Sequence, residues 1–253
     1  MAGHSKWANI KHRKGAQDAK RGKAFTRIIK ELYVAVKEGG DDSSSNPRLR
    51  SAIQNAKSVN MPKDNVERAI KKACGADADT YIEVTYEGYG PSGIAIFIEC
   101  TTDNINRTVA DIRAIFNKTG GDLGKNGSLE FLFDRKGVFN IKLQSINMDL
   151  EDFEMNLIDF GLDDMQKNDN LCIVSCPFEN FGSMQEQLNK LGIDVESSSI
   201  QRIPNDLKFL DLENSMKIMN TIDKFEDNDD VQQVFHNLEI SEELITELNK
   251  END

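Results

Sequence analysis

Helical spacing of apolar residues defines the first part of the chain. Over residues 19–38 the apolar side chains recur at intervals of three and four: Phe25, Ile28, Ile29, Leu32 and Val36. This spacing predicts an amphipathic helix that stops at Gly39-Gly40. A second helix begins at Asn46-Pro47, a cap residue followed by proline in the first turn, and a third begins at Pro62 and ends before Gly75. Together the three helices can bury one small shared core.

Strand patterns replace the helical spacing after residue 80. Two β-rich runs, at 81–86 and 94–100, are joined by a glycine-rich turn. The capping cluster Thr102-Asp103-Asn104 then opens a helix that Gly120-Gly121 closes. The apolar run at 129–133 predicts a further strand.

The stretch from about residue 136 to residue 203 predicts a complete α/β unit. Its expected elements are strand 138–143, helix 150–160, a hairpin around 168–170, strand 171–176, helix 178–191 and strand 196–203. The order βαββαβ is that of the ferredoxin-like arrangement, with both helices on one face of an antiparallel sheet. A helix at 212–225 and a strand at 231–236 follow, and we expect them to return to the preceding sheet.

The predicted fold class is therefore α+β with three domains. We expect an N-terminal three-helix domain followed by two ferredoxin-like α/β domains, the last inserted into the middle one. The expected bounds are 1–78 for the basic helical domain, 79–135 plus 205–240 for the middle domain, 136–204 for the inserted domain and 241–253 for a C-terminal tail.

Charge is distributed very unevenly along the 253 residues. The net charge is −12, but residues 1–77 hold 17 Lys and Arg against 8 Asp and Glu, whereas the remainder holds 14 against 35. The first thirty residues alone carry nine basic side chains and one acid, Asp18. This asymmetry predicts a polyanionic partner for the N-terminal segment.

The basic side chains form an arm and a stripe. On the first helix Lys20, Lys23, Arg27 and Lys30 cluster opposite the apolar set, although such a stripe is often only a solvated face. Trp7 in the arm ahead of it either stacks on an unpaired base or anchors the arm on the helices. The candidate nucleic-acid-binding residues are Lys6, Trp7, Lys11, His12, Arg13, Lys14, Lys20, Arg21, Lys23, Arg27 and Lys30. They would neutralise phosphates and carry little sequence information.

Other kinds of site find little support in the sequence. Residues 88–93 read GYGPSG, which spells GxGxxG, but a strand follows where a dinucleotide site needs a helix, so we expect a β-hairpin turn. The four cysteines lack a CxxC pair, and no catalytic constellation is recognisable, so we expect no metal, no cofactor and no enzymatic activity. The composition of the acidic run at 226–230 is typical of solvated helix and turn positions, and favours these over a mimic of nucleic acid or a cation site. Without a long apolar run, the expected location is cytoplasmic, away from the membrane.

Several segments are distinctive as written: MAGHSKWANIKHRK (1–14), NPRLR (46–50), NMPKDN (60–65), YEGYGP (86–91), TDN (102–104), NRTVA (106–110) and VQQVFHN (231–237). Together they resemble the signatures of the YebC/PmpR family across essentially the whole chain. The resemblance implies a helical N-terminal domain with two α/β domains. It also implies either DNA-binding regulation of transcription or action as a translation factor at the ribosome.

The sequence therefore predicts a nucleic-acid-binding regulator of gene expression, of the DNA-binding transcriptional type. One alternative is a ribosome-associated translation factor that binds ribosomal RNA and relieves stalled translation. Another is a protein-interaction scaffold. The expected partner is DNA or RNA.

Overall fold

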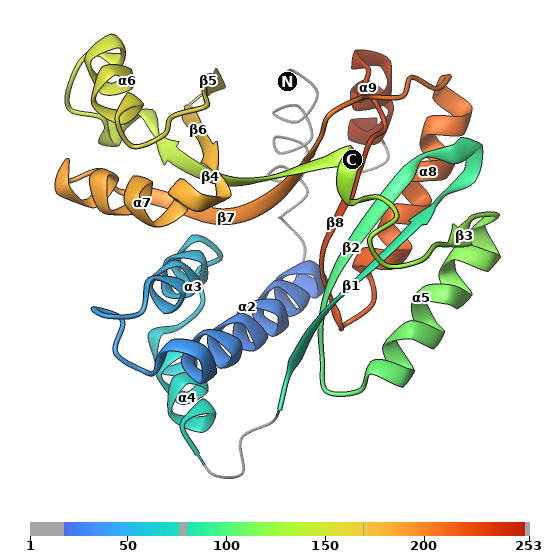
Figure 1. Ribbon diagram of the computed structural model, residues 1–253, viewed down its shortest axis with the longest axis horizontal. Coiled ribbons are helices and arrows are strands. Elements are labelled where there is room, and N and C mark those ends of the chain that lie inside the picture. Colours follow the sequence, from blue (N-terminus) through green and yellow to red (C-terminus); the bar gives the residue numbers. More distant parts are fainter. Residues whose placement is uncertain (1–17, 76–79, 169, 251–253) are drawn as a thin grey trace. The chain divides into compact units, whose positions relative to one another are not determined.

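The chain is α+β, with a helical N-terminal region followed by two four-stranded sheets (Figure 1). The structure is a computed structural model that describes residues 18–75, 80–168 and 170–250. In the described part, contacts divide the chain into two compact units. Unit 1 holds residues 18–30, 80–134 and 203–250, and unit 2 holds residues 31–75, 135–168 and 170–202. The expected three-domain boundaries stay a prediction.

The predicted N-terminal helices are present as α2 (Asp18–Gly39), α3 (Pro47–Ser58) and α4 (Lys63–Ala73). Asn46 explains the junction between α2 and α3. Its side-chain oxygen accepts from the N–H of Leu49 at 3.0 Å and caps α3, while its amide donates to the carbonyls of Ala35 and Gly40 at 2.7 and 2.8 Å. One buried amide thus ends one helix and begins the next.

The ferredoxin-like unit is confirmed in unit 2. Its elements are β4 (Phe133–Lys142), α6 (Leu150–Ile158), β5 (Asp164–Asn168), β6 (Leu171–Pro177), α7 (Phe181–Lys190) and β7 (Val195–Pro204), with short 3-10 turns at Leu143–Ser145 and Phe178–Asn180. The strand order β5-β6-β4-β7 is that of this arrangement. Phe139, Phe153, Val174 and Leu188 are fully buried in the core that these elements share.

Strand β7 lies at an edge of this sheet, and α3 supplies hydrogen bonds to it. The Asn55 amide donates to the Ser198 carbonyl at 2.9 Å and accepts from the Ser198 N–H at 3.1 Å. The side chain of Gln54 donates to the Val195 carbonyl. Backbone groups of this edge strand are therefore paired by side chains of a helix.

The sheet of unit 1 is assembled from distant parts of the chain. Its elements are β1 (Ile82–Tyr89), β2 (Ala95–Thr102), α5 (Ile105–Thr119), β3 (Asp122–Leu123), α8 (Leu212–Glu226) and β8 (Val231–His236), in the strand order β3-β1-β2-β8. β8 pairs with β2, which confirms that the last strand returns to this sheet. The strand order matches the ferredoxin-like arrangement. The position that the third strand of that fold occupies in the sheet is taken here by β1, which comes first in the chain.

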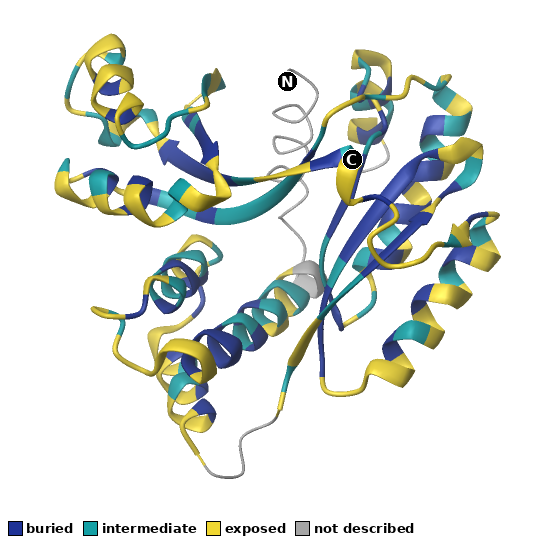
Figure 2. Cartoon of the chain, in the orientation of Figure 1, coloured by how far each residue is buried: buried dark blue, intermediate teal, exposed yellow. Residues whose placement is uncertain are grey.

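Both faces of this sheet are covered by apolar side chains, and Figure 2 shows most of β2 as buried. On one face Ile96 and Ile98 pack with residues of α5 and α8, where the rings of Phe116 and Phe225 lie 4.7 Å apart. On the other face Phe97 packs with a smaller cluster that includes Leu129, Phe133 and Phe235. This second cluster fixes the chain that follows β3.

Two segments differ from the sequence prediction. The strand expected at 129–133 is wrong, because Glu130–Leu132 forms a 3-10 turn before β4 begins at Phe133. A strand would turn Leu129, Phe131 and Phe133 to one side, but the turn buries the outer two and leaves Phe131 72% exposed. Residues expected as a tail include helix α9 (Glu242–Lys250), whose Leu244 and Leu248 join the main core.

Candidate nucleic-acid interface

The residues predicted to bind nucleic acid fall into two groups. Those of the arm lie outside the described residues: Lys6, Trp7, Lys11, His12, Arg13 and Lys14. Lys20 lies in α2, but its side chain is not described. Arg21, Lys23, Arg27 and Lys30 lie on the part of α2 that belongs to unit 1, and the structure shows what each of them contacts.

Lys30 is buried, with 6% of its surface exposed. Its ammonium donates to the Asp230 carboxylate at 2.8 Å and to the backbone oxygens of Thr101 and Asp229 at 2.9 and 2.8 Å. These acceptors use all three ammonium protons. The prediction that Lys30 belongs to a solvent-facing stripe is therefore wrong, because the end of β2 and the turn after α8 lie against this side of the helix.

Asp230 is the centre of a hydrogen-bond network that joins four separate segments of unit 1. One carboxylate oxygen accepts from Lys30, and the other accepts from Thr102 Oγ1 at 3.1 Å, Thr108 Oγ1 at 2.8 Å and Arg107 Nη2 at 2.7 Å. Burial opposes ionisation of Asp230, but the hydrogen bonds from Lys30, Arg107 and Thr108 outweigh it and lower its pKa to about 2. We call these five residues the Asp230 clamp.

Arg27 and Lys23 are directed at the same acidic segment. Arg27 donates from Nε to the Val231 carbonyl at 3.0 Å and from Nη2 to the Glu226 carbonyl at 2.8 Å. Lys23 forms an ion pair with Asp227 at 2.5 Å, in which the two side chains are 36% and 74% exposed. Three members of the basic stripe, Lys23, Arg27 and Lys30, thus donate to oxygen atoms of residues 226–231. The prediction that residues 226–230 are solvated turn positions is wrong for Asp230.

Arg21 is the most exposed of the predicted α2 cations whose side chains are described. Its guanidinium lies 5.6 Å from the centre of the Phe25 ring. Arg21 and Lys23 lie near the start of α2, next along the chain to the arm.

The sequence predicted a helix cap within the TDN motif (102–104) but not the second role of that motif. Asn104 is the cap of α5, since its side chain accepts from the N–H of Arg107 at 3.1 Å. Thr102, by contrast, belongs to the Asp230 clamp. Its partner Asp230 lies far away in the sequence, so local spacing does not predict the hydrogen bond between Thr102 and Asp230.

The GxGxxG run is a hairpin turn, as predicted. β1 and β2 pair antiparallel up to Tyr89 and Ala95, and Pro91–Gly93 forms a 3-10 turn between them. Ser92 and Gly93 both have positive φ, at 58° and 69°. A strand follows this turn, so no helix N-terminus is present there to receive a dinucleotide.

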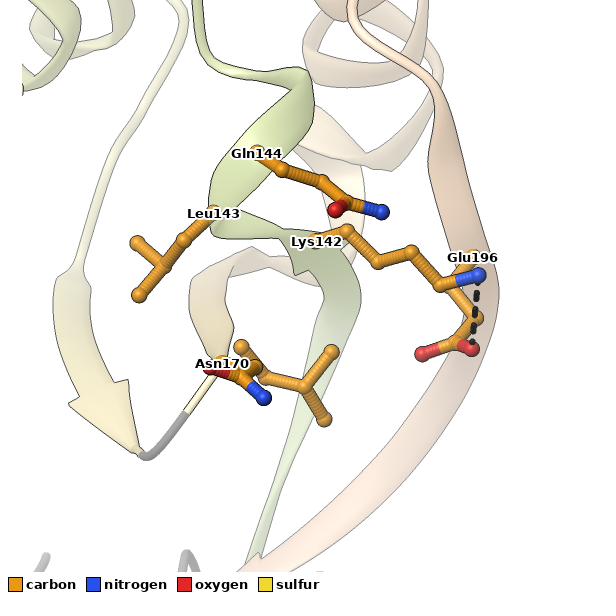
Figure 3. Close-up of a pocket in the computed structure, with 6 residues that line it drawn as sticks. Lys142, Leu143, Gln144, Asn170 and Glu196 are labelled. Atoms are coloured by element: carbon orange, nitrogen blue, oxygen red, sulfur yellow. Dashed lines mark ion pairs between the residues drawn. The ribbon is translucent and has the colours of Figure 1, made fainter.

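A hollow in unit 2 offers little chemistry. It has a volume of about 390 Å³ and lies beside the end of β4. Figure 3 draws the residues that line it. It is lined by Lys142, Leu143, Gln144, Asn170, Leu171 and Glu196. Lys142 and Glu196 form an ion pair at 3.4 Å, so the two charges in the lining neutralise each other. The lining holds no His, Cys or Ser that could act as a nucleophile or base.

Comparison with known families decides what kind of protein this is. Residues 5–76 match the family model described as the TACO1/YebC protein N-terminal domain, and residues 81–238 match the model for the TACO1/YebC second and third domain. The chain belongs to the TACO1/YebC family. The resemblance drawn from the sequence motifs is thereby confirmed.

TACO1/YebC relatives match the chain over nearly its full length. A protein of Amoebophilus asiaticus is 50% identical over 94% of this chain and 98% of its own, and one of Syntrophotalea carbinolica is 50% identical over 98% and 99%. Both are named probable transcriptional regulatory proteins. The crystal structure of a conserved hypothetical protein from Aquifex aeolicus is similar with a TM-score of 0.79, at 39% identity over 90% of this chain and 94% of that one.

These TACO1/YebC relatives are named as regulators, which agrees with the regulatory role expected from the sequence. Within the described residues, no helix combines the length and the apolar character that crossing a bilayer requires.

Proposed function

We propose that this protein is a nucleic-acid-binding regulator of gene expression, of the DNA-binding transcriptional type, that contacts phosphates through its basic N-terminal segment. The observation that carries the proposal is the charge distribution. Nine basic side chains against one acid in the first thirty residues precede a remainder, after residue 77, with 35 acids against 14 basic residues. Relatives about half identical over nearly the whole chain are named probable transcriptional regulatory proteins, which supports the regulatory part.

The contacts of α2 support two separate roles for the basic side chains of the N-terminal segment, one structural and one in binding. Arg27 and Lys30 donate to oxygen atoms of unit 1 and hold the helix there. Phosphate binding then falls to the side chains ahead of them: Lys6, Lys11, His12, Arg13, Lys14, Lys20, Arg21 and Lys23. The clamp fixes the helix from which the arm extends along the chain.

A second candidate is a translation factor that binds ribosomal RNA in the cytoplasm. The acidity of the chain after residue 77 favours it, because such a molecule repels a long polyanion laid along it and tolerates contact at one place. Folded RNA is recognised largely by shape and phosphate, which this chemistry serves. A protein-interaction scaffold remains the third candidate, and it predicts that nuclease treatment releases no partner.

Crosslinking and truncation together test the proposal. We expect the intact chain to bind nucleic acid with an affinity that falls steeply with salt, by about 0.9 log units per log unit of salt for each phosphate contacted. A variant that lacks residues 1–17 should lose most of that affinity and of its salt dependence. Sequencing the nucleic acid crosslinked to the chain in cells separates promoter DNA from ribosomal RNA. Equal binding by the truncated and intact chains would contradict the proposal.

A further inference from the structure

We propose that residues 124–128, which follow β3, form a second and preshaped contact for the phosphate backbone of a nucleic acid. We call this segment the 124–128 loop. The inference rests on the proposed function, because it adds a contact in unit 1 to the one made by the N-terminal arm. Three observations carry it: the loop is exposed, a buried carboxylate holds its backbone, and its polar side chains have no hydrogen-bond or ion-pair partner among the described residues.

The loop is a closed turn that projects into solvent. All five residues, Gly124 to Ser128, are exposed. The N–H of Ser128 donates to the carbonyl of Lys125 at 3.1 Å, and Gly127 has a φ of 82°. Glycine in the third position with positive φ is what a tight β-turn of this kind requires. The turn therefore has one defined backbone path.

A buried carboxylate fixes the base of this turn. Glu87 of β1 is 1% exposed, and its two carboxylate oxygens accept from the N–H groups of Gly127 at 2.7 Å and Leu129 at 2.6 Å. The carbonyl of Glu87 also accepts from the N–H of Gly124 at 2.7 Å. A carboxylate is costly to bury unless its oxygens are satisfied, and here backbone N–H groups satisfy both of them.

Packing of the core accounts for only part of this arrangement. Leu129 is fully buried beside Phe97 and Phe235, so the hydrogen bond from its N–H serves the core. The bond to Gly127 has no such purpose, because it holds an exposed turn that buries no large apolar side chain. Fixing an exposed loop lowers the entropy lost when a ligand orders it. We infer that the loop is held for binding.

The side chains on the loop indicate the ligand. Lys125 presents an ammonium, Asn126 an amide and Ser128 a hydroxyl, and within the described chain none of these side chains has a hydrogen-bond or ion-pair partner. These three types are among those that contact phosphate and sugar oxygens. The cations Lys23, Arg27 and Lys30 of α2 differ in that each is already directed at an oxygen of unit 1. Lys125 is therefore available to a phosphate.

The first test removes the donors of the loop. In the full-length chain we expect Lys125→Ala/Ser128→Ala to weaken binding roughly tenfold, the effect of losing about one charge-assisted hydrogen bond. The salt dependence should fall by about one phosphate contact. The probes are a fluorescein-labelled RNA hairpin and a DNA duplex of matching sequence, so that the two sources of phosphate backbone are compared. Lys118→Ala, which removes an exposed lysine of α5, is the matched control and should leave affinity unchanged.

The second test changes the sign of the expected effect. Glu87→Gln removes a negative charge beneath the loop, so long-range electrostatics alone would strengthen binding to a polyanion. A fixed loop predicts the reverse, a loss of roughly threefold to tenfold, because the amide cannot accept at both oxygen positions and the turn loosens. Glu130→Gln removes an exposed acid nearby and should not weaken binding. Thermal melts of each variant verify that it is folded.

The two proposals fail in different ways. If the intact chain binds the probes and truncation of the arm weakens it, but Lys125→Ala/Ser128→Ala binds as the intact chain does, the loop proposal is overturned and the proposed function stands. If the intact chain binds neither RNA nor DNA at low salt, both are overturned. Loss of affinity confined to one probe would support the loop and identify whether RNA or DNA is its ligand.

Discussion

Among the described residues, unit 1 buries two carboxylates, and it satisfies them by different means. Asp230 is 4% exposed and is surrounded by two cations and two hydroxyl groups. Glu87 is 1% exposed and is satisfied by neutral backbone N–H groups. The first arrangement ties four segments of the chain together, whereas the second fixes one exposed turn. A buried acid in unit 1 therefore either holds distant segments of the chain together, as Asp230 does, or fixes the backbone of an exposed turn, as Glu87 does.

The largest effect should come from Asp230. Replacing it in Asp230→Asn leaves the buried ammonium of Lys30 without a carboxylate and reduces the ion pairs of Arg107 to the exposed one with Asp103. Removing one partner of a buried ion pair costs about 3 to 5 kcal/mol of the free energy of unfolding. Chemical denaturation measures it. Asp229→Asn is the control, because this neighbouring acid is exposed and contributes only its backbone oxygen to Lys30. Equal stability of the two variants would contradict the role of the clamp.

Low pH should remove the stabilisation that Asp230 contributes to the folded state. The pKa of Asp230 is lowered from 3.8 to about 2, so the ionised form is favoured in the folded state. The resulting stabilisation is complete above about pH 4 and is lost as the pH falls toward 2. The difference in stability between the intact chain and Asp230→Asn should therefore shrink over this range. Urea unfolding of both proteins at a series of pH values measures it, and a difference that stays constant would refute the assignment.

Local sequence patterns predicted most of this framework, for a physical reason. Strand 231–236 was predicted with the bounds that the structure shows, and Asn46 was placed correctly as a cap. The residue preferences of strands and the capping chemistry of helices act over a few neighbouring residues, so they can be read from one segment. The 3-10 turn at Glu130–Leu132 escaped because its apolar pattern also fits a strand, and only tertiary packing separates the two.

The candidate site was less predictable, because the charge of a basic side chain does not determine which acceptor it binds. Lys23, Arg27 and Lys30 were grouped correctly on one side of α2, but their donors can bind oxygen atoms of residues 226–231 as well as those of a phosphate. The choice between them depends on which distant segment packs there. Glu87 was part of a recognised motif, YEGYGP, yet its link to residues 127 and 129 exists only in the folded chain.

A smaller effect on stability is expected at Glu87. In Glu87→Gln one of the N–H donors, of Gly127 or Leu129, meets an amide NH₂ in place of an oxygen. Hydrogen bonds to a charged acceptor contribute about 1.5 to 3 kcal/mol, so we expect a loss of about 2 kcal/mol in the free energy of unfolding. Hydrogen exchange at Gly127 should also accelerate. Glu130→Gln should match the intact chain in both measurements, and an unchanged exchange rate at Gly127 in Glu87→Gln would show that the turn does not depend on the carboxylate.

The smallest effect should come from the ion pair of Lys23 and Asp227, which touches the same acidic segment as the clamp but lies at the surface. Its side chains are 36% and 74% exposed, so solvent and salt screen the attraction. We expect Lys23→Ala to change the free energy of unfolding by less than about 1 kcal/mol. Lys217, which forms an exposed ion pair with Glu213 on α8, is the matched control. Lys23→Ala should nevertheless weaken nucleic-acid binding, whereas Lys217→Ala should not. If Lys23→Ala lost as much stability as Asp230→Asn, Lys23 would hold the tertiary structure together as the Asp230 clamp does. The phosphate contacts would then come from the arm alone.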